Sequence, residues 1–114
     1  MTGNNLTNAE PWLDTARRDR EAAAHLRAGG FFALTCFLCQ QAAEKALKAY
    51  LRACGETAPQ GHGLGGLGHR CADHDADFRS VIDPCRRLGR HYVATRYPDA
   101  LGDERRWSTQ RRLT

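Results

Sequence analysis

Small and apolar residues recur at three- and four-residue steps in the first part of the chain, along Trp12–Leu26. This is the spacing of one face of an amphipathic helix. The preceding segment Thr7–Glu10 has the spelling of a capping box, and the glycine pair Gly29-Gly30 is typical of a helix end. We therefore predict a first helix over residues 9–28.

The next segment, Phe31–Cys54, contains no glycine or proline and is rich in residues that favour helices. Its first part, Phe31–Cys39, is apolar nearly all round, whereas Gln40–Leu51 mixes apolar and charged residues. A helix that is apolar on every side is buried on every side, and a chain of 114 residues can hardly enclose it alone. We predict that this is the central helix, covered by its neighbours or by a second subunit in a homodimer.

Glycines dominate the segment Glu56–Gly68, which predicts a loop followed by a short helix, dependent on tertiary contacts, that ends near Ala72. Asp73–Asp75 then has the composition of an acidic cap, and an apolar stripe along Phe78–Tyr92 predicts another helix. Pro84 lies within that stripe, so we expect it to kink or divide the helix.

The pattern breaks at Arg96–Asp99, because the residue before a proline is pushed out of helical conformation. The remainder is basic and only weakly periodic, as expected of a frayed helix or a disordered tail. No window has the alternation of a strand. We predict an all-α fold, an antiparallel up-and-down bundle of four to five helices. The expected organisation is an N-terminal extension (1–8), the bundle (9–100) and a basic C-terminal tail or short helix (101–114).

Length and composition add a location to this picture. The longest apolar run is about half the roughly 20 residues that cross a bilayer. The polar N-terminus lacks the basic-then-apolar order of a signal peptide. Five cysteines, an odd count, are typical of reduced thiols rather than of a disulfide framework. We expect a cytoplasmic protein that makes no membrane contact.

The positive charge is concentrated near the C-terminus. From Arg86 onward there are eight arginines and three acidic residues, which gives this part a net charge of +5. The whole chain has a net charge of +4, so the first 85 residues sum to −1. A surface of this kind attracts phosphates and polyanions. A solvated basic tail that keeps the protein soluble explains the same charge.

Three blocks in this order resemble one family. Gln41–Ala49 resembles the central-helix motif of HEPN domains (higher eukaryotes and prokaryotes nucleotide-binding), and His62–Leu67 resembles the family's His-x-Leu-x-x-Leu loop. Tyr92 with Arg96–Asp99 resembles the Tyr and Arg-Tyr-Pro-Asp block of one branch. The resemblance covers residues 10–100.

This resemblance implies a bundle of four or five helices that commonly pairs as a homodimer. It also implies work beside, or fused to, a small nucleotidyltransferase, often in toxin–antitoxin or defence operons. Members usually carry a last amphipathic helix after the Arg-Tyr-Pro-Asp block. The corresponding stretch Leu101–Thr114 is short and arginine-rich, so the closing helix is expected to be truncated or altered.

Ribonuclease members of the superfamily carry an arginine followed four to six residues later by a histidine. Metal-free RNA cleavage needs a group to take the 2′-hydroxyl proton and a cation to stabilise the phosphorane. No histidine follows Arg96, whereas Arg86 has His91 five positions later. In a straight helix five positions place side chains about 140° apart. Arg86 and His91 are therefore candidate catalytic residues, with ordinary surface residues as the alternative.

The candidate nucleotide- or phosphate-binding residues are Lys45, Lys48, Arg96, Tyr97 and Asp99. For the lysines the alternative is a solvated helix face on which Glu44 pairs with Lys48. In the Arg96–Asp99 block, the tyrosine can stack on a base and the arginine can hold a phosphate through two hydrogen bonds. The alternative there is a turn whose arginine and aspartate pair with each other.

Metal chemistry has weaker support. Cys36-x-x-Cys39 with Cys71-x-x-His74 has the ligand types of a zinc site, but the first two cysteines lie in an apolar stretch where packing is the simpler account. His62 is interpreted as a structural loop residue. The glycine-rich segment lacks the Gly-Lys-Ser/Thr ending of a phosphate-binding loop. We predict neither a metal nor a cofactor.

Three functions remain open from the sequence. The first is a HEPN-type nucleotide- or RNA-binding homodimer that works with a small nucleotidyltransferase in a toxin–antitoxin-like pair. The second is a metal-independent endoribonuclease toxin. The third is a helical protein-interaction module without a ligand.

Overall fold

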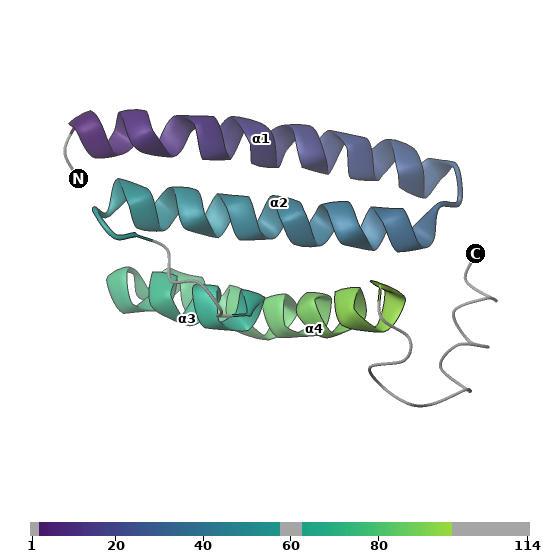
Figure 1. Ribbon diagram of the computed structural model, residues 1–114. Coiled ribbons are helices and arrows are strands. Elements are labelled where there is room, and N and C mark those ends of the chain that lie inside the picture. The colour runs from purple at the N-terminus through teal and green to yellow at the C-terminus, as the bar shows by residue number, and fades with distance from the viewer. Residues whose placement is uncertain (1–2, 58–62, 97–114) are drawn as a thin grey trace.

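The computed structural model of the chain describes residues 3–57 and 63–96 (Figure 1). This part folds into four α-helices and one short 3-10 helix, and it contains no strand. The elements are α1 (Gly3–Ala28), α2 (Phe32–Ala53), α3 (Leu64–His74), η1 (Ala76–Phe78) and α4 (Arg79–Arg96). The predicted all-α helical bundle is confirmed. No helix in these residues is long and apolar enough to cross a membrane.

The helix α2 lies in the middle of the bundle. In Figure 1, α1 runs antiparallel along one side of α2, and the hairpin of α3 and α4 lies along the other side. Each of the other three α-helices therefore packs against α2. The prediction of a central helix within Phe31–Cys54 is confirmed, and its bounds agree with the structure to within a residue at each end.

Small residues bring α1 close to α2. Ala9, Ala16 and Ala23 follow one another at a seven-residue step, and all three are buried. The helix begins at Gly3, so the predicted capping box is wrong, because Thr7 lies inside the helix. Pro11 does not prevent this, since its fixed φ is close to the helical value and only one backbone hydrogen bond is lost.

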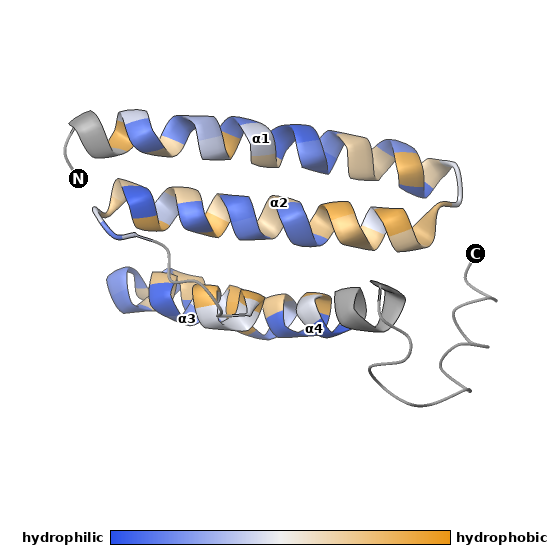
Figure 2. Cartoon of the chain, viewed as in Figure 1, coloured by the Kyte–Doolittle hydropathy of each residue, from blue (hydrophilic) through white to orange (hydrophobic). Residues whose placement is uncertain are grey.

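The main core lies between α2 and the α3–α4 hairpin. Its buried members are Leu47, Leu51, Leu64, Leu67, Cys71 and Cys85. All the buried residues of α2 lie between Leu47 and Ala53. Figure 2 shows the apolar first half of the same helix at the other end, beside the α1–α2 turn. In the described part of the chain no residue of the segment 31–40 is fully buried, and the buried core residues of α2 all lie in its second half.

The glycine-rich segment of α3 is helical because it packs against α2 and α4 through Leu64, Leu67 and Cys71. A Cβ atom on Gly68 would lie 3.6 Å from the Cα atom of Ile82, and one on Gly65 would lie 2.5 Å from Cγ of Arg86. The first distance is an ordinary van der Waals contact, whereas the second means that a side chain at position 65 would collide with the stem of Arg86. Packing against α4 offsets the low helix propensity of these glycines. The predicted dependence on tertiary contacts fits this geometry, although the helix extends past Ala72 to His74.

Pro84 does not divide α4, which runs without interruption from Arg79 to Arg96. Ile82 and Cys85 flank the proline and are both buried, so core packing holds this turn helical despite the lost backbone hydrogen bond. Asp75 caps the turn that precedes α4, because its Oδ1 accepts a hydrogen bond from the backbone N–H of Asp77 at 3.0 Å. The predicted C-terminal tail lies outside the described residues.

Candidate functional site

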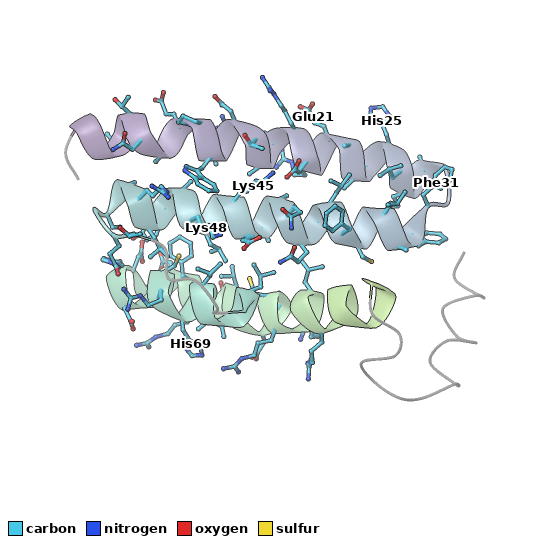
Figure 3. All side chains as sticks on the ribbon, viewed as in Figure 1. Glu21, His25, Phe31, Lys45, Lys48 and His69 are labelled. Carbon is cyan, nitrogen blue, oxygen red and sulfur yellow. The ribbon has the colours of Figure 1, made fainter. Side chains whose placement is uncertain are left out.

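Lys45 lies in the seam between α1 and α2. Its Nζ donates a hydrogen bond to Oδ2 of Asp19 at 2.7 Å, and the two side chains are only 23% and 16% exposed (Figure 3). A pair this shielded from water is held more firmly than a surface pair. The ammonium group of Lys45 therefore has a carboxylate partner that ties the two long helices together.

Lys48 lies one turn further along α2 and is also engaged. Its Nζ is 3.1 Å from Oε1 of Glu44 and 5.7 Å from the centre of the Trp12 ring. The guanidinium of Arg52 lies over the same ring at 4.9 Å, which is within cation–π distance. The expected pairing of Glu44 with Lys48 is thus present. A phosphate bound by either lysine would compete with a carboxylate, and their role as phosphate ligands stays a prediction.

A hollow of about 440 Å³ opens between α3 and α4, on a different face of the bundle. Its lining consists of His69, Ala72, Asp73, Arg79, Ile82, Asp83 and Arg86. Nη2 of Arg86 donates a hydrogen bond to Nε2 of His69 at 2.8 Å. In Figure 3, His69 points away from α2. The hollow thus brings two guanidinium groups and an imidazole together with two carboxylates.

Arg86 contacts His69 of the neighbouring helix, a residue that the sequence analysis did not single out. The side chain of His91 lies outside the described residues, so the predicted pair of Arg86 and His91 stays a prediction. Sequence reasoning missed His69, although one signal was present. His69 follows Gly65 by four positions, which places both on one face of a helix.

A second polar cluster joins the end of α2 to α3. Glu56 accepts a hydrogen bond from Arg70 and contacts the imidazole of His74. Tyr50 meets the ring of His74 edge-on with ring centres 6.3 Å apart, and a hydrogen bond with Cys54 raises the pKa of Tyr50 to about 12. The phenol of Tyr50 therefore stays protonated at neutral pH, and the contacts of this cluster join the end of α2 to α3.

The cysteines do not form the zinc arrangement that their spacing allows. All five are free thiols, and no group of three or more metal-ligating side chains comes together among the described residues. Cys71 is buried, its Sγ donates to the backbone carbonyl of Leu47 at 3.6 Å, and burial raises the pKa of this thiol to about 11. Burial also raises the pKa of Cys85. These two thiols are packing residues of the core.

The remaining candidates lie at or beyond the end of the described chain. Arg96 is the last residue of α4, and its side chain is not described. Tyr97, Asp99 and the loop residue His62 lie outside the described residues. The roles predicted for these four residues therefore stay predictions.

Comparison with known proteins gives one match. The model of the HEPN domain family matches residues 9–111, which is nearly the whole chain. No curated protein and no solved structure matches the chain.

If Lys45 and Asp19 form a structural pair, replacing either should leave a shielded charge without its partner. We expect Lys45→Met and Asp19→Asn each to lower the free energy of unfolding by about 1–2 kcal/mol. The double variant should lose less than the sum of the two, by about 1 kcal/mol, in urea unfolding. Arg17→Met removes an exposed partner of Asp14 and serves as the control, with an expected change within about 0.5 kcal/mol. Additive losses for Lys45 and Asp19 would show that the contact contributes nothing.

Proposed function

This chain belongs to the HEPN domain family, and from that membership we propose that it is a nucleotide- or RNA-binding homodimer that works with a small nucleotidyltransferase as a toxin–antitoxin-like pair. Two surfaces of the bundle support the proposal. Among the described residues, Phe31, Phe32 and Leu34 at the start of α2 are exposed, and the outer side of α4 is basic.

The apolar surface at the α1–α2 turn supports the homodimer. Phe31, Phe32 and Leu34 are 57%, 42% and 48% exposed, and none of the residues 31–40 is buried. Apolar side chains gathered in this way on a small protein mark an interaction surface. A second copy of the chain offers the same surface, so a two-fold axis beside α2 covers both copies at once.

The basic surface supports an anionic ligand. Four arginines of α4, at positions 79, 86, 87 and 90, are exposed, and further positive charge follows in the sequence. Nucleotides and RNA share the phosphate group, and guanidinium groups bind phosphate in a favourable planar geometry. The α3–α4 hollow adjoins two of these arginines, which is the single observation that carries the binding proposal.

The dimer is tested by light scattering at micromolar concentration. We expect a mass of twice the 12.7 kDa chain, because pairing removes the exposed phenylalanines from water. Leu34→Asp places a charge in the proposed interface and should yield a monomer. Leu6→Asp makes the same change at an equally exposed leucine near the start of α1 and should leave the dimer intact. A wild-type protein with the mass of one chain would overturn the homodimer.

Ligand binding is tested by fluorescence anisotropy with a labelled single-stranded RNA and with a labelled mononucleotide. We expect binding to at least one of them at low salt. The logarithm of the affinity for RNA should fall linearly with the logarithm of the salt concentration, because binding to arginines releases counterions. If the pure homodimer binds neither probe, the protein is a helical interaction module without a ligand.

A second candidate function is a metal-independent endoribonuclease, which the contact between Arg86 and His69 favours. An imidazole beside a guanidinium combines a possible base with a cation that can stabilise a phosphorane. Cleavage of RNA in the presence of EDTA, compared among wild type, His69→Ala and His91→Ala, separates the two functions. We expect the RNA to remain intact in all three samples. Cleavage that is lost in either variant would replace the binding proposal with an enzyme.

The nucleotidyltransferase partner follows from the family and is approached through the gene. A nucleotidyltransferase reading frame beside this one, whose product co-purifies with the chain after co-expression, is the result that the proposal expects.

A further inference from the structure

We propose that the α3–α4 hollow is a phosphate-binding subsite in which Arg86, positioned by Gly65 and His69, holds one phosphate group of an RNA strand. The inference rests on the proposed nucleotide or RNA binding and names the place where it occurs. It differs from the spacing-based pair of Arg86 and His91, because the second residue comes from another helix.

Gly65 provides a seat for the side chain of Arg86. The residue is buried in α3, and a Cβ atom at this position would lie 2.5 Å from Cγ, 3.4 Å from Nε and 3.5 Å from Cδ of Arg86. The aliphatic stem of the arginine thus crosses the space that a side chain at position 65 would fill. An arginine that is free in solution loses much rotamer entropy when it binds a ligand, and a side chain that is already seated loses less.

His69 fixes the end of the same side chain. It lies one helical turn after Gly65, and its Nε2 accepts the hydrogen bond from Nη2 of Arg86 at 2.8 Å. A guanidinium has five N–H groups in a rigid fork, and the imidazole uses one of them. Asp83 lies 3.6 Å from Nη1, longer than a good hydrogen bond, and both side chains of this pair are more than half exposed. Donors therefore remain for a phosphate, which displaces a weak surface pair.

The rest of the hollow suits the same ligand. Arg79 precedes Arg86 by seven positions in α4, which places both on one side of the helix, and both line the hollow. Ala72 and Ile82 add apolar atoms to the lining, against which a ribose can lie. Asp73 and Asp83 also line the hollow, so a phosphate there has to compete with two carboxylates for the two arginines.

The strand continues along α4. Arg90 is exposed and follows Arg86 by one helical turn, about 6 Å along the helix axis. A second phosphate of the same strand therefore meets a second arginine outside the hollow. A free nucleotide carries phosphate of the same chemistry but has no second nucleotide to reach Arg90. This difference distinguishes the two sources of phosphate.

The test measures the affinity of the dimer for a labelled single-stranded RNA by anisotropy at fixed low salt. Arg86→Ala should weaken binding about tenfold, since it removes a charge-assisted, two-point contact. Arg87→Ala removes the same charge from the neighbouring position, which does not line the hollow, and should weaken binding less than about threefold. Asp83→Asn removes the competing carboxylate and should strengthen binding about threefold.

Gly65→Ala tests whether the space beside Gly65 positions the stem of Arg86, and it does so without any change of charge. The added methyl group must displace the stem of Arg86, so we expect a loss close to that of Arg86→Ala. In the Arg86→Ala background the same glycine change should have no further effect. Circular dichroism and thermal unfolding identify variants that remain folded. If Gly65→Ala does not fold, the comparison of Arg86→Ala with the exposed control Arg87→Ala decides the question.

Three outcomes overturn the inference in distinguishable ways. If wild type binds RNA while Arg86→Ala and Arg87→Ala bind equally well, the subsite is wrong and the proposed function stands. If wild type binds neither RNA nor a mononucleotide, both the subsite and the proposed nucleotide or RNA binding are wrong. If unlabelled AMP displaces the RNA as effectively, per phosphate, as unlabelled RNA does, and Arg90→Ala has no effect, the ligand is a free nucleotide rather than a strand.

Discussion

The central helix α2 has to be packed on more than one side, and the rest of the bundle depends on this requirement. Its second half meets α1 through alanines on one side and the leucines of α3 on the other. Asp19 and Lys45 hold the first of these contacts in register. Its first half is more apolar, and Phe32 and Leu34 in it are exposed among the described residues. One helix therefore supplies both the core of the monomer and the surface proposed for the dimer.

The second constraint is the close approach of α3 and α4. Each glycine within a helix costs about 1 kcal/mol relative to alanine, and α3 contains three of them. Burial of Leu64, Leu67 and Cys71 opposes this cost, since a fully buried leucine contributes about 2 kcal/mol. At Gly68 a Cβ atom would make an ordinary contact with Ile82, whereas at Gly65 the missing side chain leaves room for the stem of Arg86. The packing of α3 against α4 therefore contributes both to the core and to the proposed phosphate site. Figure 3 places Phe31 and His69 at opposite ends of the bundle, so the proposed dimer surface and ligand surface do not compete.

The sequence predicted those features that depend on local patterns. The absence of glycine and proline from Phe31–Cys54 predicted the extent of α2, and the glycine-rich segment predicted a loop and a short helix that needs tertiary contacts. Local rules failed where packing opposes them. Thr7 lies inside α1 although its spelling is that of a cap, and Pro84 lies inside an undivided α4. Contacts between helices could not be predicted at all. Arg86 finds His69 seventeen positions away only because α3 and α4 dock in one register, and Asp19 meets Lys45 for a similar reason.

The proposed dimer surface and the proposed RNA surface lie on different parts of the bundle. Hydrogen–deuterium exchange of the wild-type protein, with and without a short single-stranded RNA, tests this division directly. We expect RNA to slow exchange in residues 64–74 and 79–90 and to leave residues 32–40 unchanged, because those amides belong to the dimer surface in both samples. Slower exchange confined to residues 32–40, or to the seam around Trp12 and Lys48, would contradict it.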